Sequence, residues 1–432
     1  NILDSFTSKI GNEIFLELGD YNTINSHPFI KKDTNNYLLF HHYSILEAVY
    51  ESPFHWFLKD EKYISTASDN RGVFTENFSA EMLSKVFGEK NVYKNIDIYE
   101  NKKRVGEIDV LIVFGNRAII LQAKSKKLTL GARKGNDKLI AKDFKKAIQD
   151  SYNQGNDCAK FIQDSAYQLS DSNKNELSLR KDFKEIYIFC TVSDHYPSLP
   201  FQTQQFLKYE ETEIIKPPFI MDIFLLDVMV EMLSNPLYFL SYVNKRTTLF
   251  KKIMVQSELS ILSYHLKRNL YLDDNYSMMM IEDDVSSDLD LALFVRRKGI
   301  PGNHTPDGIL TKFQGTIIGN FLDKIKEYED DYAIEIGFFL LTLSEEAITQ
   351  INEGIQKTID LFLEDKKGHD FTIGFNEGPT GLTIHTNNLE YDIAFESLLD
   401  HCKVRKYKQH ANNWFGLCFD PLTKQFKFGV MS

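Results

Sequence analysis

Residues 106–124 read GEIDVLIVFGNRAIILQAK, and this stretch sets the expectation for the fold. Two apolar runs rich in β-branched residues flank the dipeptide Gly115-Asn116. A Gly-Asn pair between strand-like runs predicts a two-residue hairpin turn, because such a turn needs backbone with positive φ. We therefore expect an antiparallel β-hairpin that turns at residues 115–116.

The position of the turn predicts which residues of the two strands face each other. Counting outward gives the pairs Phe114–Arg117, Leu111–Ile120, Asp109–Gln122 and Glu107–Lys124. Opposed residues on antiparallel strands share a face, with Cβ atoms about 5 Å apart. Two carboxylates, an amide and an ammonium group are thus expected at one end of an apolar ribbon. The plain alternative is a solvated strand end with a Glu107–Lys124 salt bridge.

This group of side chains suits a divalent metal and an activated water. Mg²⁺ prefers oxygen ligands, and it commonly takes one or two carboxylates together with waters and substrate phosphate. A lysine beside such an ion can polarise the water or hold the phosphate. The hairpin end therefore predicts chemistry at a phosphodiester.

The pattern of Asp109, twelve intervening residues and Gln122-Ala123-Lys124 resembles the PD-(D/E)xK nuclease superfamily. It is most similar to the branch that includes Mrr-type restriction endonucleases and nuclease-related (NERD) domains, in which Gln often replaces the first acid of the ExK element. Ile108 departs from the proline of the family pattern. The resemblance covers about residues 71–195.

The resemblance implies an α/β fold with a PD-(D/E)xK core, a mixed sheet flanked by helices. It implies a Mg²⁺-dependent endonuclease that hydrolyses phosphodiester bonds in DNA, with Mn²⁺ as an alternative ion. The implied metal ligands are Asp109, Gln122, Glu76 and the backbone carbonyl of Ala123. The implied catalytic residues are Asp109, Gln122, Lys124 and Glu76.

Glu76 lies in a predicted helix over residues 74–87. Thr75 is the expected N-cap and Gly88 the expected residue after the last turn. At helical spacing Glu76 shares a face with apolar residues such as Leu83, an unusual place for a solvated acid. The alternative is that Glu76 only favours the positive end of the helix.

A second helix is predicted over residues 141–165, and it follows the hairpin in the chain. Gln149-x-x-Tyr152 is similar to the QxxxY element of RecB-like nucleases but one residue shorter, and Gln154 is a second candidate for the same role. The segment 102–146 is also rich in lysine and arginine, which fits contact with a polyanion or a solvated surface. The predicted nucleic-acid contacts are Lys126, Lys127, Arg133, Lys134, Lys145, Gln149 and Tyr152.

Composition limits the remaining possibilities. The 432-residue chain is 43% hydrophobic with a net charge of −11, so it can form several domains but has no overall basic character. Four scattered cysteines show no zinc-binding spacing, which indicates a reducing compartment. No run of 18 apolar residues and no signal peptide are seen, so we expect a cytoplasmic protein without membrane contact.

We expect four regions along the chain. They are a mixed N-terminal region (1–70), the nuclease-like core (71–199), a helical extension (200–275) and, after an acidic linker at 273–290, a C-terminal α+β regulatory or partner-binding domain (291–432). In that last domain residues 332–343 are predicted to be a strand, and Ser344 is predicted to cap a helix.

Two functional hypotheses follow from these observations. The first is a DNA endonuclease in prokaryotic restriction or anti-phage defence, working alone, as a homodimer or with a regulatory or ATPase/helicase partner. The second is a catalytically silent scaffold of the same fold that binds nucleic acid or a partner within a defence complex. Cleavage assays of Lys124→Ala separate the two.

Overall fold

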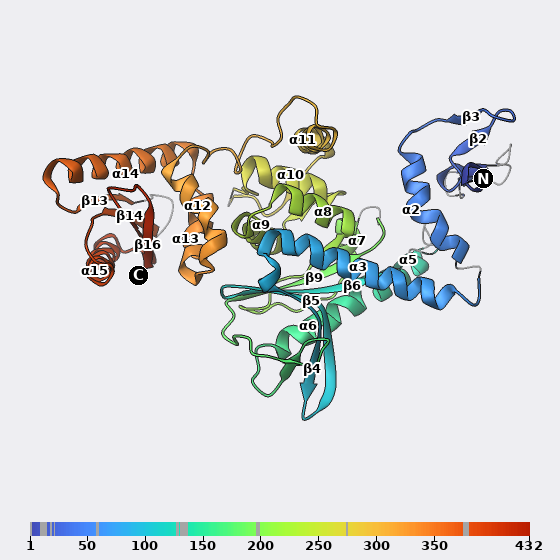
Figure 1. Ribbon diagram of the computed structural model, residues 1–432, viewed down its shortest axis with the longest axis horizontal. Helices are drawn as coiled ribbons and strands as arrows, with labels where there is room; N and C mark the ends of the chain where they lie inside the picture. Colours follow the sequence, from blue (N-terminus) through green and yellow to red (C-terminus); the bar gives the residue numbers. More distant parts are fainter. Residues whose placement is uncertain are drawn as a thin grey trace.

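A computed structural model describes residues 2–8, 15–17, 20, 22–57, 60–126, 129, 137–195, 199–273, 275–374 and 380–432. These residues form an N-terminal arm, a central unit around a seven-stranded sheet and a C-terminal unit with a four-stranded sheet (Figure 1). The fold is therefore a mixed α/β arrangement with several sheets. None of the described helices is long and apolar enough to cross a membrane.

The central sheet has the strand order β10-β9-β6-β5-β4-β7-β8. β9 pairs in parallel with β6 and β10, and the other neighbours are antiparallel. The strands are β4 (Val92–Glu100), β5 (Lys103–Phe114), β6 (Arg117–Lys124), β7 (Gln168–Ser170), β8 (Glu176–Leu177), β9 (Glu185–Val192) and β10 (Phe219–Asp222).

The predicted hairpin forms between β5 and β6. Its turn is at Gly115-Asn116, where Gly115 has φ of +54°, and the pairs Phe114–Arg117 and Leu111–Ile120 are as expected. Pairing between these two strands ends at Val110–Leu121. The two predicted pairs beyond this point, one joining residues 109 and 122 and the other 107 and 124, were wrong.

The alternation of β5 explains why its pairing with β6 stops. Val110 and Ile112 belong to the core on one face of the sheet, whereas Ile108 and Leu111 belong to the core on the other face. The period of two is therefore broken at Asp109. The carboxylate of Asp109 takes the N–H of Ala123 as its hydrogen-bond donor, at 2.7 Å.

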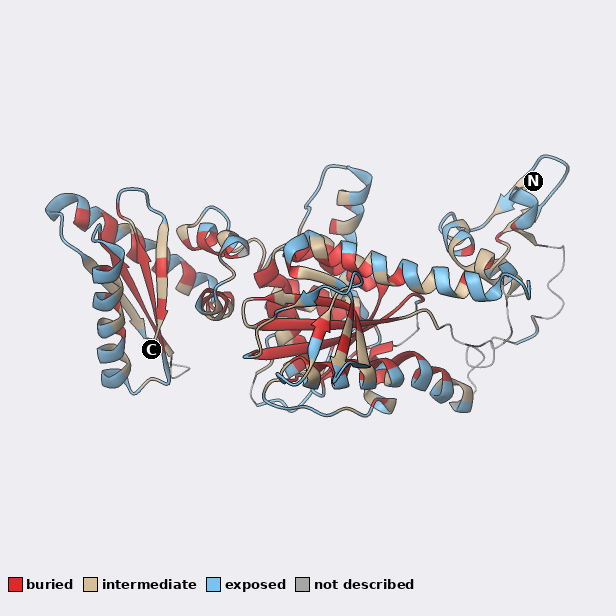
Figure 2. Ribbon diagram, turned by 60° about the horizontal axis from the view of Figure 1, so that its bottom comes forward, coloured by how far each residue is buried: buried red, intermediate tan, exposed pale blue. Residues whose placement is uncertain are grey.

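Two layers of helices cover the sheet, and most of its strands are buried between them (Figure 2). On one face lie α3 (Ile64–Phe87), α8 (Ile223–Met232), α9 (Pro236–Thr248) and α10 (Glu258–Arg268). The other face carries α5 (Asp137–Phe144), a π-helical turn (Lys145–Gln149), α6 (Asp150–Phe161) and α7 (Leu199–Phe206).

α3 begins earlier in the chain than predicted, and this changes the structural role of Thr75. The helix starts at Ile64, so Thr75 lies inside it and its hydroxyl donates to the carbonyl of Arg71 at 2.8 Å. The predicted N-cap at Thr75 was wrong, because the apolar face of the later turns continues toward the N-terminus only weakly. The predicted end is confirmed, since Gly88 follows Phe87 with φ of +81°.

The region after residue 200 is not purely helical. The strand β10 joins the edge of the central sheet beside β9, and Asp222 caps α8 through the N–H of Leu225. Residues 273–290, predicted to be a linker, include β12 and the first residues of α11, and the hydroxyl of Ser263 donates to the carbonyl of Val285 at 2.6 Å. The short elements here are β11 (Ile253–Met254), β12 (Met279–Met280), a 3-10 turn (Asp283–Ser286) and α11 (Ser287–Lys298).

The C-terminal unit places three helices beside the sheet β13-β14-β15-β16 and one, α12, next to α9. Its elements are α12 (Ile317–Tyr328), α13 (Asp331–Leu341), α14 (Glu345–Asp365), β13 (His369–Gly374), β14 (Thr380–Thr386), α15 (Tyr391–Gln409), β15 (Asn413–Phe419) and β16 (Phe426–Met431). The cap of α14 at Ser344 is confirmed by its hydrogen bond from the N–H of Ala347.

Residues 332–343 are helical, so the predicted strand was wrong. The side chain of Asp330 accepts the N–H groups of Tyr332 and Ala333 and starts α13. Gly337 then allows α13 to pack closely on α9, because a Cβ there would lie 2.5 Å from Leu237. A short apolar run does not distinguish a buried helix from a buried strand, and the cap decides here.

The N-terminal arm extends from the central unit (Figure 1). It contains α1 (Ile2–Ser5), β1 (Thr7–Ser8), a 3-10 turn (Thr23–Asn25), β2 (Phe29–Lys31), β3 (Tyr37–Leu39) and α2 (Ser44–Phe57), and a further 3-10 turn (Glu89–Asn91) follows α3. α2 contacts the central unit where the hydroxyl of Tyr50 donates to the carbonyl of Ser193 at 2.6 Å.

Candidate active site

The candidate site lies where four elements of the central unit meet. α3 supplies Glu76, β5 supplies Asp109, β6 supplies Gln122 and Lys124, and α6 supplies Gln154. The charges of Glu76 and Lys124 both act on the pKa of Asp109, so these three side chains lie in one neighbourhood. Gln122 is linked to the same neighbourhood through the carbonyl of Glu107, to which Gln122 and Gln154 both donate.

Asp109 is the most buried carboxylate of the group, with 8% of its surface exposed. Burial raises the pKa of Asp109 to about 6, although the N–H of Ala123 and the charge of Lys124 act in the opposite direction. Ionisation of Asp109 at this buried position is therefore costly. A cation bound beside it would remove that cost.

The side chain of Gln122 is fully buried, and only one of its two polar atoms has a hydrogen-bond partner among the described residues. Its Nε2 donates to the carbonyl of Glu107 at 2.8 Å, and its Oε1 has no hydrogen-bond partner among the described residues. Buried amide oxygens almost always have a donor or a cation nearby, because an unmet acceptor costs about 1–3 kcal/mol. The free oxygen is the observation that most directly indicates a ligand.

Lys124 is held by α6. Its Nζ donates to Oε1 of Gln154 at 3.1 Å, while Nε2 of Gln154 donates to the carbonyl of Glu107 at 3.2 Å. Glu107 forms an ion pair with Arg104 at 2.7 Å. The alternative of a Glu107–Lys124 salt bridge was wrong, since the described residues form no such pair.

Glu76 lies in the middle of α3, close enough to Glu107 and Lys124 for their charges to act on its pKa. Burial raises its pKa, the nearby charge of Glu107 raises it further, and Lys124 lowers it. Because α3 begins at Ile64, Glu76 is several turns from the helix N-terminus, and the helix dipole does not account for its position.

Close packing of α6 on the sheet sets the geometry of the site. Gly155 faces β9, and a Cβ at this position would lie 2.7 Å from Cγ2 of Ile188 and 3.5 Å from Cγ of Gln122. One turn earlier, the hydroxyl of Ser151 donates to the carbonyl of Gln122 at 3.2 Å. The sequence shows this small-residue face, but we did not predict that Ser151 and Gly155 support the site.

Gln149 and Tyr152 do not reach the site, which corrects their predicted role. The amide of Gln149 exchanges two hydrogen bonds with the backbone of Lys208, at 2.8 and 2.9 Å. Tyr152 is 2% exposed, and its hydroxyl bonds the backbone of Glu210. Both residues fasten the segment after α7, and Gln154 is the helix residue that contacts Lys124.

Two of the predicted lysine contacts are engaged with carboxylates. Lys126 lies 3.4 Å from Asp143, and Lys145 lies 2.6 Å from Asp150. A phosphate would have to compete with these pairs, most easily at the exposed Lys145. The predicted contacts Lys127, Arg133 and Lys134 lie outside the described residues.

The ligand set of the site differs from an all-acidic metal centre. Within the described ranges, no group of three or more His, Cys, Asp or Glu side chains is arranged to hold a metal ion. A metal here would need the amide oxygen of Gln122 beside Asp109, with water completing its shell. Mg²⁺ is commonly bound in this sparse manner.

Comparison with known proteins supports the same part of the chain. Residues 71–192 match the family model of the nuclease-related domain, NERD. The match begins in α3, ends at the last residue of β9 and contains every residue of the candidate site. Neither the curated proteins nor the solved structures gave a match to this chain.

Proposed function

We propose that the chain is a metal-dependent endonuclease that hydrolyses phosphodiester bonds in DNA. The observation that carries the proposal is the meeting of Asp109, the unpartnered Oε1 of Gln122 and Lys124 inside the segment that matches the nuclease-related domain. The order α3–β4–β5–β6–α6–β9 supports a PD-(D/E)xK core.

The residues present fit a divalent cation such as Mg²⁺ or Mn²⁺. Asp109 offers a buried carboxylate with a raised pKa, and Gln122 offers an oxygen without a donor. Glu76 would join directly or through water, and the carbonyl of Ala123 is a further ligand. When bound, the cation supplies an activated water and charge stabilisation at the phosphate.

The chain's own groups then have separate tasks. Asp109 and Gln122 would hold the cation, and this role requires an ionised Asp109. Lys124 stabilises negative charge on the scissile phosphate and orients the attacking water. Gln154 holds the ammonium group of Lys124 at 3.1 Å, which limits where that charge can sit.

The biological setting is proposed by resemblance. Restriction or anti-phage defence fits an endonuclease whose activity must be controlled, and the C-terminal unit offers a surface for a regulatory or ATPase/helicase partner. Cleavage of both strands of a duplex would favour a homodimer. The fold alone does not assign these roles.

Cleavage of supercoiled plasmid and linear DNA with Mg²⁺ or Mn²⁺ tests the proposal. Wild type should cut, and Lys124→Ala and Asp109→Ala should lose cutting while keeping their circular dichroism spectra. Lys85→Ala is a matched control, because Lys85 pairs with Glu81 on the exposed side of α3. Unchanged cutting in either site variant would refute the assignment.

A silent scaffold is the second candidate, and the absence of a three-ligand cluster among the described residues favours it. In this case the protein would bind DNA or a protein partner and would bind Mn²⁺ only weakly. Calorimetric titration with Mn²⁺ separates the two. Binding that disappears in Asp109→Asn supports the nuclease, whereas no binding together with no cutting supports the scaffold.

A further inference from the structure

A hollow of about 280 Å³ lies where the central and C-terminal units meet, away from the candidate active site. Its walls come from α9, α13 and the first residues of β14 and β15. The lining residues are Ser241, Asn244, Lys245, Glu335, Phe338, Phe339, Thr342, Thr380, Asn413 and Phe415.

One of the lining residues, Lys245, has a positive charge without an ion-pair partner among the described residues. Its Nζ donates to the carbonyl of Asn269 at 2.9 Å. Burial and the nearby charge of Lys312 lower the pKa of Lys245 to about 8. An anion in the hollow would stabilise the charged form of this lysine.

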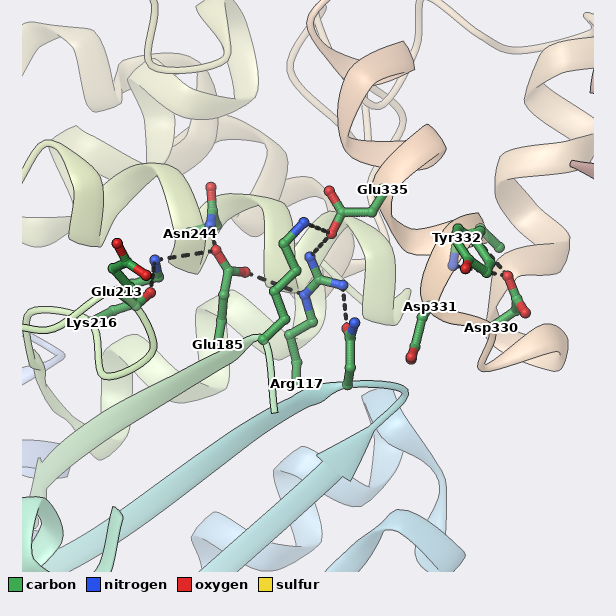
Figure 3. A network of polar contacts seen from close by, with 12 residues as sticks. Arg117, Glu185, Glu213, Lys216, Asn244, Asp330, Asp331, Tyr332 and Glu335 are labelled. Carbon is green, nitrogen blue, oxygen red and sulfur yellow. Dashed lines mark hydrogen bonds and ion pairs between the residues drawn. The ribbon is translucent and has the colours of Figure 1, made fainter. Parts of the chain in front are cut away.

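The acid in the lining does not oppose an anion. Glu335 forms ion pairs with Arg117 and with Lys184, so its negative charge is already compensated (Figure 3). Asn244, also in the lining, uses its Nδ2 to contact Glu185 at 2.9 Å. The local sum of charge therefore favours a negative ligand.

Three phenylalanine side chains, Phe338, Phe339 and Phe415, also line the hollow. The rings of Phe339 and Phe415 stack with centroids 4.8 Å apart and an interplanar angle of 21°. Phe338 lies beside them, and the guanidinium of Arg117 sits over its ring at 5.4 Å. Aromatic side chains of this kind pack against planar rings face to face or edge to face, and the hydroxyl and amide groups in the lining can fix the orientation of such a ring.

We propose that this hollow binds a mononucleotide-like ligand, with its phosphate at Lys245 and its base against the phenylalanine rings. Junctions between structural units are frequent places for small ligands, and the volume is close to the lower end of the usual range of about 300–1,000 Å³. The proposal stands independently of the nuclease activity. Glu335 and Phe338 both contact Arg117, so an occupied hollow would also act on the turn end of the β5–β6 hairpin.

Calorimetric titration of the full chain with adenosine 5′-monophosphate tests the proposal, with adenosine and inorganic phosphate as the partial ligands. We expect the mononucleotide to bind at least about tenfold more tightly than either fragment.

Three variants locate the binding. Lys245→Gln removes the cation at similar size, and Asn413→Asp adds a negative charge to an exposed part of the lining, so each should weaken binding by about tenfold or more. Lys252→Gln, an exposed lysine just beyond α9, should bind as wild type. Thermal melts check that each variant folds.

Three results would overturn the proposal. The first is the absence of mononucleotide binding at millimolar concentration. The second is equal affinity for inorganic phosphate and for the mononucleotide, which would remove the role of the rings. The third is wild-type affinity in both Lys245→Gln and Asn413→Asp, which would place the ligand elsewhere.

Discussion

Arg117 forms an ion pair with Glu335, and this contact joins the first residue of β6 to α13 (Figure 3). Arg117 is 1% exposed, and its Nε also contacts Glu185 at 3.3 Å. The turn between β5 and β6 also packs closely against α13, because a Cβ on Gly115 would lie 2.8 Å from Cδ1 of Ile334. The hairpin that carries the candidate site is thus fastened to the C-terminal unit at its other end.

Arg117→Ala should destabilise the protein by about 3–5 kcal/mol, because it leaves the buried carboxylate of Glu185 and the acid on α13 without their shared guanidinium. Urea denaturation measures the change in the free energy of unfolding. Lys160→Ala removes the exposed pair with Glu210 and serves as the control, with an expected change below about 1 kcal/mol. Equal effects of the two substitutions would contradict the role given to Arg117.

Asp109→Asn should increase stability above pH 6 in metal-free buffer. Burial raises the folded-state pKa of Asp109 from 3.8 to about 6, so the folded state holds its proton more tightly than the unfolded chain. The free energy of unfolding therefore falls as pH rises from about 4 to about 6, by about 3 kcal/mol in total. The asparagine variant lacks this loss.

Denaturation of wild type and Asp109→Asn at pH 4 and pH 8, with a chelator present, measures this difference. The two proteins should be similar at pH 4, and the variant should be the more stable at pH 8 while it fails to cut DNA. Asp157→Asn, an exposed position on α6, is the control. If the variant is less stable than wild type at pH 8, ionised Asp109 does not destabilise the folded state and the prediction is wrong.

The sequence predicted the hairpin and its turn, because these follow from local turn chemistry and a period of two. It did not predict how β5 behaves at Asp109. Alternation assumes regular pairing, and here a side-chain carboxylate replaces a backbone partner of Ala123. A register counted from a turn is reliable only as far as the pairing is regular.

Helix starts and long-range contacts were harder to predict. Residues 332–343, predicted to be a strand, form most of the helix α13. Their apolar pattern fits either a strand or a helix, and the helix forms because Asp330 caps its N-terminus and Gly337 allows close packing on α9. Likewise Gln149 fitted the spacing of a known element, but its partner is the backbone of Lys208, 59 positions further along the chain. Spacing along one helix does not show which neighbour packs against it.

Gly155→Ala should lower both stability and cutting. The added methyl would lie 2.7 Å from Cγ2 of Ile188, which forces α6 away from β9 and costs about 1–3 kcal/mol. Gln154 moves with the helix, so cutting should fall more than the unfolded fraction explains. Introducing Gly155→Ala into an Ile188→Ala background should reduce its cost, and an unchanged cost would show that the clash is not the cause.

Gln154→Leu should reduce cutting by about 10–100-fold through the position of Lys124. The amide links the Nζ of Lys124 to the carbonyl of Glu107, so its loss frees the ammonium group to move away from the phosphate. Gln154→Glu keeps an acceptor for Lys124 and should retain more activity than the leucine variant.

The pH profile of cutting distinguishes this positioning role from a structural one. At Mg²⁺ concentrations well below saturation, the wild-type rate should rise as Asp109 of the metal-free protein ionises near pH 6, since the cation binds the ionised carboxylate. Gln154→Leu should lower the plateau and leave this rise in place, whereas a collapsed site would lose the rise as well. If Gln154→Leu cuts at the wild-type rate, Lys124 is held by another group and the assignment of Gln154 fails.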